Sequence, residues 1–509
     1  MLTDGTVSKL KKAMLISFTI LFLLSILFLK DYRMFVKAGS VTWTVDDDGP
    51  ADFSTVQEAI NIAAPGDTIF VHIGTYYENI LVDKTVSLIG ENKDETIVYG
   101  NGTGSVISLK ANDINIQGFT IKNSSDRLYD SGIFIDRRSS GNSISLNTIS
   151  NNNDGITLYS SSDNIVSNNT ISNNTSNGIV LYSSNNNIFS GNTISNNSDG
   201  ISLYSSSNNM FSRNTISNNK NGIYPAFDSI NSTIYHNNFN NGKNVQTDSI
   251  NSWDYEGEGN YWSDYAGNDP NGDGIGKIPY IIDSYNQDEY PLMGMFSEFS
   301  ITLETEAYIV TTICNSTVSN LIFEIGVETG NKLIHFNIAG EDRTAGFCRV
   351  AIPTGLMKPP YIVLVGSNEV NATLLNGSNE TYKRLYFTYS HKSRTVSIIS
   401  SETQLLYNEL LTNYRQLQED LSDLNTTHQG LLNNYNILLD NYSQLQESID
   451  ELNASYEKHL SDYSGQMQII RSLVYMFAAT TGIFMITTIY LSKIAHTSIR
   501  TKTKESITK

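Results

Sequence analysis

Acidic and basic side chains gather on one short stretch of the chain, in and just after the segment SSDRLYDS at residues 124–131. Six of them would lie close together if this segment forms a loop beside the strand that follows: Asp126, Arg127, Asp130, Asp136, Arg137 and Arg138. Carboxylates and guanidinium groups gathered in one place can perform general acid–base catalysis or bind an acidic sugar. The alternative is a solvated loop held by surface ion pairs.

A second candidate site is a turn rich in side-chain oxygens, DPNGDG at residues 269–274. Three oxygen ligands would alternate along it: Asp269, Asn271 and Asp273. This is the first half of a calcium loop, whose last ligand is a glutamate. Tyr280 stands at that last position, so Asp264 or Asp283 would have to substitute. A plain Asp/Asn/Gly turn is the alternative, and no other cofactor is expected.

Three tyrosines recur at one position of a repeated motif, in DGITLYSSS, NGIVLYSSN and DGISLYSSS: Tyr159, Tyr182 and Tyr204. If alternate residues of this motif point inwards, the tyrosines point outwards and stack on successive units. Phenol rings in a row form an amphipathic strip that suits sugar rings, which is one hypothesis for a ligand-binding site. A ladder that only stiffens a sheet is the other hypothesis.

The tyrosines belong to a repeat that covers residues 131–240. Its copies are marked by five glycines, which are separated by 23, 23, 22 and 22 residues: Gly132, Gly155, Gly178, Gly200 and Gly222. A near-constant step of this size indicates stacked units that cannot bury an apolar face alone. Each copy holds short alternating runs broken by Asn, Ser and Gly, which predicts strands with one buried face.

Stacking one coil per repeat, with strands about 4.8 Å apart, predicts a parallel β-helix. Three apolar columns would fill its interior: Ile133/Ile156/Ile179/Ile201/Ile223, Ile144/Val166/Phe189/Phe211/Ile234 and Ile149/Ile171/Ile194/Ile216/Phe239. A polar column of Asn147, Asn169, Asn192, Asn214 and Asn237 is expected at a turn, where asparagine can hydrogen-bond the coils above and below.

The segment before the repeats, TWTVDDDGPADFSTVQEAINIAAPGDTIFVHIG, predicts a short amphipathic helix that plugs the open end of the solenoid. This segment resembles the start of pectin-lyase-like β-helix proteins. The repeats and the closing run NSWDYEGEGNYWSDYAGNDPNGDGIG resemble the NosD family and related surface proteins, many of them archaeal. The resemblance covers roughly residues 41–295. It implies a right-handed β-helix, often a carbohydrate-related role, and for NosD an association with copper-enzyme maturation in the periplasm.

The residues give these family activities little support. Copper sites need clustered His, Met or Cys, whereas residues 41–295 hold only His72 and His236, far apart in sequence. The coil positions where related hydrolases carry paired aspartates read NTI, and no Gly-His-Gly motif is present. The Gln/Asp/Arg constellation of esterases with a similar start cannot be placed either.

The remaining sequence predicts further segments with distinct compositions. They are a signal peptide or retained membrane anchor at 1–38, a β-helix at 39–298, a seven-stranded β-sandwich at 299–400, a coiled-coil stalk at 401–471, an apolar transmembrane helix at 472–492 and a basic cytoplasmic tail at 493–509. Both ends would then lie inside the cell, with the middle outside.

The overall charge and the cysteines limit the function further. The formal net charge of −19 over 509 residues argues against a nucleic-acid partner. In an exported chain, Cys314 and Cys348 could form one disulfide. Many N-x-S/T sequons, for example at Asn101, Asn174 and Asn231, become glycan candidates if the chain is exported.

The sequence therefore predicts an all-β right-handed parallel β-helix, followed by an antiparallel β-sandwich, a long coiled-coil helix and a C-terminal transmembrane helix. The expected function is that of a membrane-anchored surface protein that binds or adheres to extracellular polysaccharide or cell-envelope components, with a coiled-coil homo-oligomer as a further expectation. A polysaccharide lyase or hydrolase is the main alternative, and a copper-maturation factor is the third.

Overall fold

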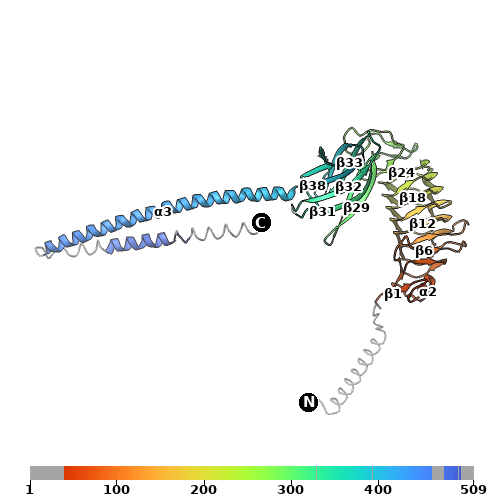
Figure 1. Ribbon diagram of the computed structural model, residues 1–509, viewed down its shortest axis with the longest axis horizontal. Helices are drawn as coiled ribbons and strands as arrows, with labels where there is room; N and C mark the ends of the chain where they lie inside the picture. Colours follow the sequence, from red (N-terminus) through yellow and green to blue (C-terminus); the bar gives the residue numbers. More distant parts are fainter. Residues whose placement is uncertain (1–38, 328, 393, 461–474, 491, 494–509) are drawn as a thin grey trace, which may run out of the picture. The chain divides into compact units, whose positions relative to one another are not determined.

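The computed structural model describes residues 39–327, 329–392, 394–460, 475–490 and 492–493 (Figure 1). The chain divides into two compact units, residues 1–405 and 406–509, and each is described by itself. The predicted leader at 1–38 and the tail beyond residue 493 lie outside the described residues.

The first unit begins with a parallel β-solenoid whose coils each add one strand to three sheets, as the ladder of strands in Figure 1 shows. Sheet A contains β1 Thr42–Val45, β2 Thr68–Val71, β5 Ser87–Gly90, β8 Asn115–Gln117, β11 Ser143–Ser145, β14 Ile165–Ser167, β17 Ile188–Ser190, β20 Met210–Ser212 and β23 Thr233–Tyr235. Sheet B contains β3 Gly74–Tyr76, β6 Thr96–Tyr99, β9 Thr120–Lys122, β12 Thr148–Ser150, β15 Thr170–Ser172, β18 Thr193–Ser195, β21 Thr215–Ser217, β24 Asn238–Asn240 and β26 Tyr261–Trp262. Sheet C contains β4 Ile80–Val82, β7 Ile107–Leu109, β10 Ser131–Ile135, β13 Asp154–Tyr159, β16 Asn177–Tyr182, β19 Asp199–Tyr204, β22 Asn221–Ala226 and β25 Lys243–Val245.

The register of the coils confirms the predicted apolar columns. Ile156 pairs with Ile179, and Ile179 pairs with Ile201, so residues about two dozen positions apart are neighbours in sheet C. All members of the three columns are fully buried, in a core that runs without a break from Val45 to Trp262. Each coil thus completes its neighbour's core, as a solenoid requires.

The repeat glycines lie at the start of the long strands of sheet C, where a side chain would point into the packed core. A Cβ atom built on Gly178 would lie 2.6 Å from the carbonyl oxygen of Gly200 and 2.6 Å from Cγ2 of Ile194. Both neighbours belong to the packed core, and neither can move away cheaply.

Gly178→Ala is therefore expected to lower the free energy of unfolding by about 1–3 kcal/mol, as overpacked cores do. Chemical denaturation followed by circular dichroism measures the loss. Gly66→Ala is a useful contrast, because a Cβ there would meet no atom within 4 Å, although its φ of +97° is strained for alanine. A variant at Gly178 as stable as wild type would refute the close-packing argument.

Asparagine ladders line all three corners of the solenoid, whereas the sequence predicted one. At the corner between sheets A and B, each backbone N–H donates to the side-chain oxygen of the asparagine in the next coil at 3.0 Å: Asn147 to Asn169, Asn169 to Asn192, Asn192 to Asn214, Asn214 to Asn237 and Asn237 to Asn260. The corner between C and A carries Asn142, Asn164, Asn187 and Asn209, and the corner between B and C carries Asn152, Asn174, Asn197, Asn219 and Asn241. The donors of every ladder point towards the C-terminal end of the solenoid.

A short helix closes the first coil, as predicted. Helix α2 (Val56–Ile62) buries Val56, Ala59 and Ile60 against the core. The Glu78 carboxylate accepts the first free N–H groups of the helix at 2.8 and 2.9 Å. The Lys84 ammonium donates to three carbonyl oxygens at its C-terminal end, at 2.7–3.0 Å. Opposite charges thus complement both ends of the helix dipole.

Aromatic side chains close the other end. Trp253 and Trp262 are each 1% exposed, and the Tyr280 ring stacks on Trp262 at 4.3 Å. Tyr280 lies in β27 (Tyr280–Ile281), which pairs with β28 (Gln287–Asp288). Trp253 and Trp262 therefore cover the last coil, whereas Tyr255 is 49% exposed.

Two five-stranded antiparallel sheets follow and share one apolar core. Sheet D contains β29 Met295–Leu303, β30 Glu306–Cys314, β33 Ala345–Pro353, β37 Tyr382–Ser390 and β36 Ala372–Leu374. Sheet E contains β31 Thr317–Ile325, β32 Lys332–Ala339, β38 Arg394–Ser400, β34 Tyr361–Val365 and β35 Asn368–Val370. Seven strands were predicted, and β30, β35 and β36 were missed. Cys314 and Cys348 face each other across β30 and β33 and form a disulfide.

Helix α3 (Glu402–Leu460) confirms the predicted long helix and spans about 90 Å. No helix in the described residues is both long enough and apolar enough to cross a membrane. The predicted transmembrane segment 472–492 lies partly outside the described residues, and the structure does not confirm that prediction.

Candidate functional site

The outer face of sheet C carries the predicted tyrosines together with two further columns. Tyr159, Tyr182 and Tyr204 pair in register, as predicted. A middle column of Phe134, Thr157, Val180, Ser202 and Tyr224 runs beside them, and a polar column of Asp154, Asn177, Asp199 and Asn221 lies where the strands begin. The longest strands of the solenoid therefore present aromatic and acidic groups side by side.

The tyrosine rings stack face to face rather than lying flat on the sheet. The Tyr182 and Tyr204 ring centroids are 5.2 Å apart at an interplanar angle of 14°. Rings lying side by side in one plane would collide through their edge hydrogens at this distance, so these two must be offset-stacked. The faces of these two rings are therefore turned to each other and not to solvent, whereas the Tyr159 and Tyr182 rings are tilted by 52° at 6.4 Å. This corrects the expectation of a flat phenol strip.

The tyrosines also cover the middle column. Thr157, Val180 and Ser202 point outwards but are fully buried. The Ser202 side chain interacts with the Tyr204 hydroxyl, and the charge of Asp154 acts on Tyr182. Burial, and then the charges of Asp154 and Asp199, raise the pKa values of Tyr182 and Tyr204, so the phenol groups lie near the polar column.

Tyr159, Tyr182 and Tyr204 form what we call the tyrosine band. Other aromatic side chains lie at both of its ends. Tyr129 comes from the inserted loop, and its ring meets Tyr159 and Tyr182 edge-on at 5.5 and 5.0 Å. At the other end Phe227 lies 5.8 Å from Tyr204 and is 64% exposed. The result is a continuous amphipathic patch over several coils, of the kind that marks a binding surface.

Asp154 is the deeply buried acidic group of the polar column. It is 2% exposed, and its Oδ1 accepts both the backbone N–H and the side-chain N–H of Asn177, at 2.9 and 2.8 Å. Burial raises the pKa of this carboxyl above its ordinary value, against the lowering effect of the Asn177 hydrogen bonds. Asp199 stands two strands further along the same column and is half-buried.

The six charged candidates of the inserted loop do not form one acid–base centre. Among the described residues, no ion pair joins any of them. Asp126, Arg127, Arg137 and Arg138 are exposed, while Asp130 accepts a short hydrogen bond from Ser125 and Asp136 accepts the N–H of Arg137 at 2.7 Å. The Arg137 guanidinium instead lies 5.7 Å from the Tyr159 ring centre, within cation–π range. Tyr129 of the loop and Arg137, which follows strand β10, thus both join the tyrosine band through the Tyr159 ring.

The solenoid and its closing region carry a recognisable family signature. Residues 60–267 match the NosD family model. That model is described as periplasmic copper-binding protein (NosD), and the match includes the coils that build the tyrosine band. No curated protein matches this chain significantly. The resemblance that the repeats suggested is therefore confirmed for this region.

Several solved β-helix structures are also similar, with low identity. Pectin methylesterase PemA from Erwinia chrysanthemi is 14% identical, with 38% of this chain and 82% of that chain covered and a TM-score of 0.28. Pectin methylesterase from Yersinia enterocolitica is 12% identical, covering 42% and 95%, with a TM-score of 0.30. Alginate lyase from Paenibacillus sp. str. FPU-7 is 14% identical, covering 44% and 98%, with a TM-score of 0.28.

The NosD-matching region does not offer a copper site among its described residues. His72 lies in the first coils and pairs with Glu91 at 3.0 Å, whereas His236 lies near the last coil and pairs with Glu258 at 2.7 Å. Met210 is 36% exposed on sheet A, away from both histidines along the chain. Copper prefers clustered nitrogen and sulfur ligands, and this donor set does not fit it.

The predicted calcium turn forms an ordered loop at the end of the NosD match. Both carboxylate oxygens of Asp269 accept backbone N–H groups, from Asp273 at 3.1 Å and Gly274 at 2.7 Å. The Asn271 amide approaches the Asp273 carboxylate, and Lys277 lies 3.7 Å from that carboxylate. The three predicted ligands are thus brought together. Tyr280 hydrogen-bonds Asp264 instead, and Asp283 is bound by Asn286.

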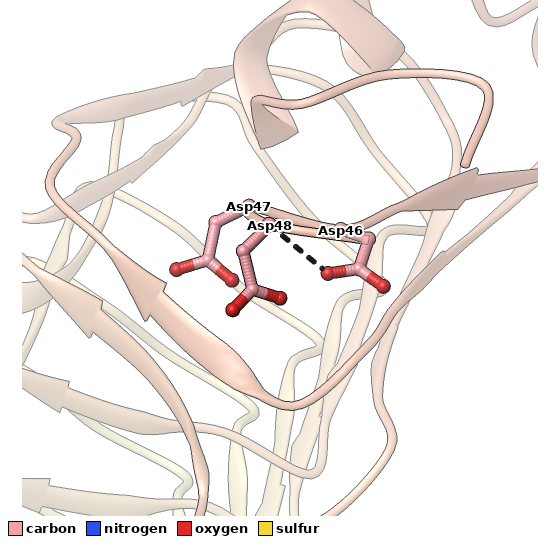
Figure 2. A group of neighbouring side chains, drawn as sticks. All are labelled: Asp46, Asp47 and Asp48. Carbon is pink, nitrogen blue, oxygen red and sulfur yellow. Dashed lines mark hydrogen bonds between the residues drawn. The ribbon is translucent and has the colours of Figure 1, made fainter. Parts of the chain in front are cut away.

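A third acidic group was not singled out from the sequence. In the described part of the chain, Asp46, Asp47 and Asp48 are the group of His, Cys, Asp or Glu side chains close enough to share a cation, with ligand atoms within 4.8 Å of one another. Figure 2 shows the three carboxylates on one side of the turn before α2, with the Asp48 N–H donating to Asp46. Asp47 also accepts the N–H of Thr75 at 3.1 Å. These contacts shape the turn.

Proposed function

We propose that the chain is an exported surface protein whose tyrosine band binds polysaccharide. The carrying observation is the continuous row of phenol edges and hydroxyl groups on the outer face of sheet C, beside the Asp154 and Asp199 carboxylates. Sugars are recognised by amphipathic aromatic edges together with groups that accept hydrogen bonds from their hydroxyls. The row repeats on three successive coils, so its natural partner is a chain that repeats as well.

Removing the tyrosine hydroxyl groups tests the binding proposal most sharply, because these groups would contact the sugar. The double variant Tyr182→Phe/Tyr204→Phe keeps both rings, and with them the cover over Val180 and Ser202. We expect polysaccharide binding to weaken roughly tenfold, because two hydrogen bonds of about 0.5–1.5 kcal/mol each are lost. Affinity electrophoresis against a panel of neutral and acidic polysaccharides measures this, with thermal stability unchanged.

Tyr77 supplies the matched control, since it is 76% exposed and lies between sheets B and C in the first coils. Tyr77→Phe should leave binding unchanged. Equal affinity of wild type and the double variant for every retained polysaccharide would contradict a role for the tyrosine band.

A polysaccharide hydrolase or lyase is the competing proposal, and Asp154 favours it. Its buried carboxyl holds a proton to a higher pH than an exposed aspartate, as a general acid must, and Asp199 stands two strands away. Release of reducing ends or unsaturated sugars from the same panel, abolished in Asp154→Asn, would establish the enzyme in place of the binding protein.

We place the binding surface outside the cell on the strength of the apolar N-terminal run at 13–29 and the apolar run at 472–492. Helix α3 would serve as a stalk that pairs with copies of itself. Its described leucines at the d heptad positions, such as Leu417, Leu431 and Leu445, are between 40% and 67% exposed. Protease digestion of intact cells tests the exposure, and analytical ultracentrifugation tests the oligomer.

Calcium at the Asp269–Asp273 loop remains part of the proposal. If the loop binds the ion, saturating calcium should stabilise the protein by about 2.7 kcal/mol at a hundredfold excess over Kd. Thermal unfolding with and without calcium measures the shift, and Asn271→Ala should abolish it. Magnesium is the control, because it resists losing its water ligands. Unchanged unfolding in millimolar calcium would show that this is an ordinary turn.

A further inference from the structure

Asparagines that start N-x-S/T sequons are distributed unevenly between the surface and the interior of the solenoid. Seven lie in its described coils: Asn101, Asn123, Asn168, Asn173, Asn174, Asn196 and Asn231. In a sequence this rich in Asn, Ser and Thr, many such triplets arise by chance. The fold separates those whose amide is open to solvent from those whose amide is already used.

Two consecutive residues show the contrast most clearly. Asn173 and Asn174 each begin a sequon, in NNT and NTS. Asn173 is exposed at the corner between sheets B and C, and its Nδ2 donates only to the neighbouring Ser172 hydroxyl at 3.3 Å, outside the ladder. Asn174 is 3% exposed, and its Nδ2 donates to the Asn197 side chain at 3.1 Å and to the Ile149 carbonyl at 3.4 Å.

Four of the other five solenoid sequons, all but Asn101, divide in the same way. Asn168, Asn196 and Asn231 are exposed corner residues with φ between 56° and 59°. Asn123 is half-buried, and its Nδ2 donates to the Gly100 carbonyl at 2.6 Å. A glycan on Asn123 or Asn174 would remove a donor hydrogen from an internal bond, and on Asn174 it would also have no space.

We infer that the exported chain is N-glycosylated at the corner asparagines Asn168, Asn173, Asn196 and Asn231, and that Asn123 and Asn174 stay bare. The inference rests on the proposed export. The donor is a lipid-phosphate-linked oligosaccharide: a bond forms between the asparagine Nδ2 and the anomeric carbon, the bond from that carbon to the phosphate oxygen breaks, the amide loses one proton and the lipid phosphate leaves.

The positions of these corners have a consequence for binding. None of the seven sequon asparagines lies within a strand of sheet C. Asn173 and Asn196 lie at the corner between sheets B and C, and Asn231 lies at the corner between sheets C and A, so glycans there would flank the tyrosine band on both sides without occupying its strands. The modification would thus limit the width of a molecule that can lie along the band.

The experiment uses the full chain, produced in a host that N-glycosylates exported proteins. Glycans are released by an amidase in heavy-oxygen water, and mass spectrometry locates each asparagine converted to labelled aspartate. We expect label at the four corner positions and none at Asn174. Asn173→Gln should lose one glycan without a change in melting temperature. Asn174→Gln should keep the glycan pattern but lower the melting temperature by several degrees, because it breaks the ladder.

Protease digestion of intact cells, run in parallel, distinguishes a failure of the glycosylation inference from a failure of the proposed export. Label at Asn174 or Asn123 in folded protein overturns the glycan map. A protein that is accessible outside the cell but carries no label overturns the inference and leaves the binding proposal standing. A protein that stays protected inside the cell overturns both.

Discussion

Replacing Asp288 with alanine is expected to lower the free energy of unfolding by about 2–6 kcal/mol, because two buried donors lose their acceptor at about 1–3 kcal/mol each. Asp288 is fully buried in β28. Its Oδ2 accepts the N–H of Asn260 at 2.7 Å and the indole N–H of Trp262 at 2.9 Å, and its Oδ1 accepts the N–H of Tyr290 at 3.0 Å. Denaturant unfolding of full-length protein measures the loss.

The size of this effect follows from the direction of the ladders. All backbone donors of the A/B ladder point towards the C-terminal end, so Asn260 has no further asparagine to receive its N–H, and Asp288 takes that place. The other two ladders also end at carboxylates, with different donors. The C/A ladder continues from Asn209 through Ser232 and Asn251 to Asn286, whose N–H donates to Asp283 at 2.9 Å. The B/C ladder continues from Asn241 to Asn244, whose side-chain N–H donates to Asp264 at 2.8 Å. Aligned amides polarise one another, which strengthens the bond to a terminal carboxylate.

Asp288 also gives the stability a pH dependence. Burial raises its pKa to about 7, although hydrogen bonds from Asn260 and Trp262 oppose the rise. The unfolded carboxyl titrates near 3.8, so between these values the folded state binds more protons, and stability falls as the pH rises towards 7. Unfolding free energy should be higher near pH 5 than near pH 8. In Asp288→Asn, which supplies the amide of an ordinary ladder position, this slope should disappear.

Asp264→Ala is the matched control, because Asp264 also ends a ladder but is exposed. Water can replace its carboxylate, so the expected loss is under about 1 kcal/mol. Equal losses in Asp264→Ala and Asp288→Ala would show that burial does not set the cost of removing a ladder end.

The period of the repeat was enough to predict the interior of the solenoid. Once Gly155 and Gly178 are aligned, Ile156 must meet Ile179, and Asn169 must meet Asn192, because strand pairing admits no other register. The other two ladders were equally visible as repeated asparagines, for instance at Asn164 and Asn187, but only the column at the tightest turn was recognised.

The residues that end the asparagine ladders and the orientation of the tyrosine rings could not be predicted from the sequence. Asp288 lies 28 residues after Asn260, across a region with no repeat, so no pattern connects them. Whether Tyr182 shows a face or an edge depends on its side-chain rotamer and on Tyr204. The charged loop misled for a related reason: proximity in sequence does not show that Arg137 turns to a tyrosine ring instead of a carboxylate.

Glu258→Ala is expected to cost about 3–5 kcal/mol and to separate the unfolding of the solenoid from that of the sandwich. Glu258 lies between Trp253 and Trp262 in the aromatic end of the solenoid, with 17% of its side chain exposed. Its carboxylate meets the Arg349 guanidinium of β33 at 2.8 Å and His236 of the solenoid at 2.7 Å. Removal of the carboxylate leaves Arg349, whose side chain is 8% exposed, as a buried charge without its partner.

The pKa of Glu258 predicts how the joint between the solenoid and the sandwich responds to acid. Burial alone would raise the pKa of Glu258, but the His236 hydrogen bond and the charges of Arg349 and Arg384 outweigh it and hold the pKa at about 2. The unfolded value is 4.5, so the contribution to stability is complete above that pH and is lost as the pH falls towards 2. Calorimetry should therefore show wild type dividing into two transitions in strong acid, as Glu258→Ala does at neutral pH.

An exposed ion pair across the same joint supplies the control. Arg213 of the solenoid meets Glu298 of β29 at 3.0 Å, with 40% and 28% of the side chains exposed, so Glu298→Ala should cost at most about 1 kcal/mol. Asn238 and Phe296 exchange two hydrogen bonds nearby, each of 2.8 Å, and these remain in both variants. If Glu258→Ala still unfolds in one transition, those bonds and the apolar contacts around Leu292 hold the joint without the buried charge.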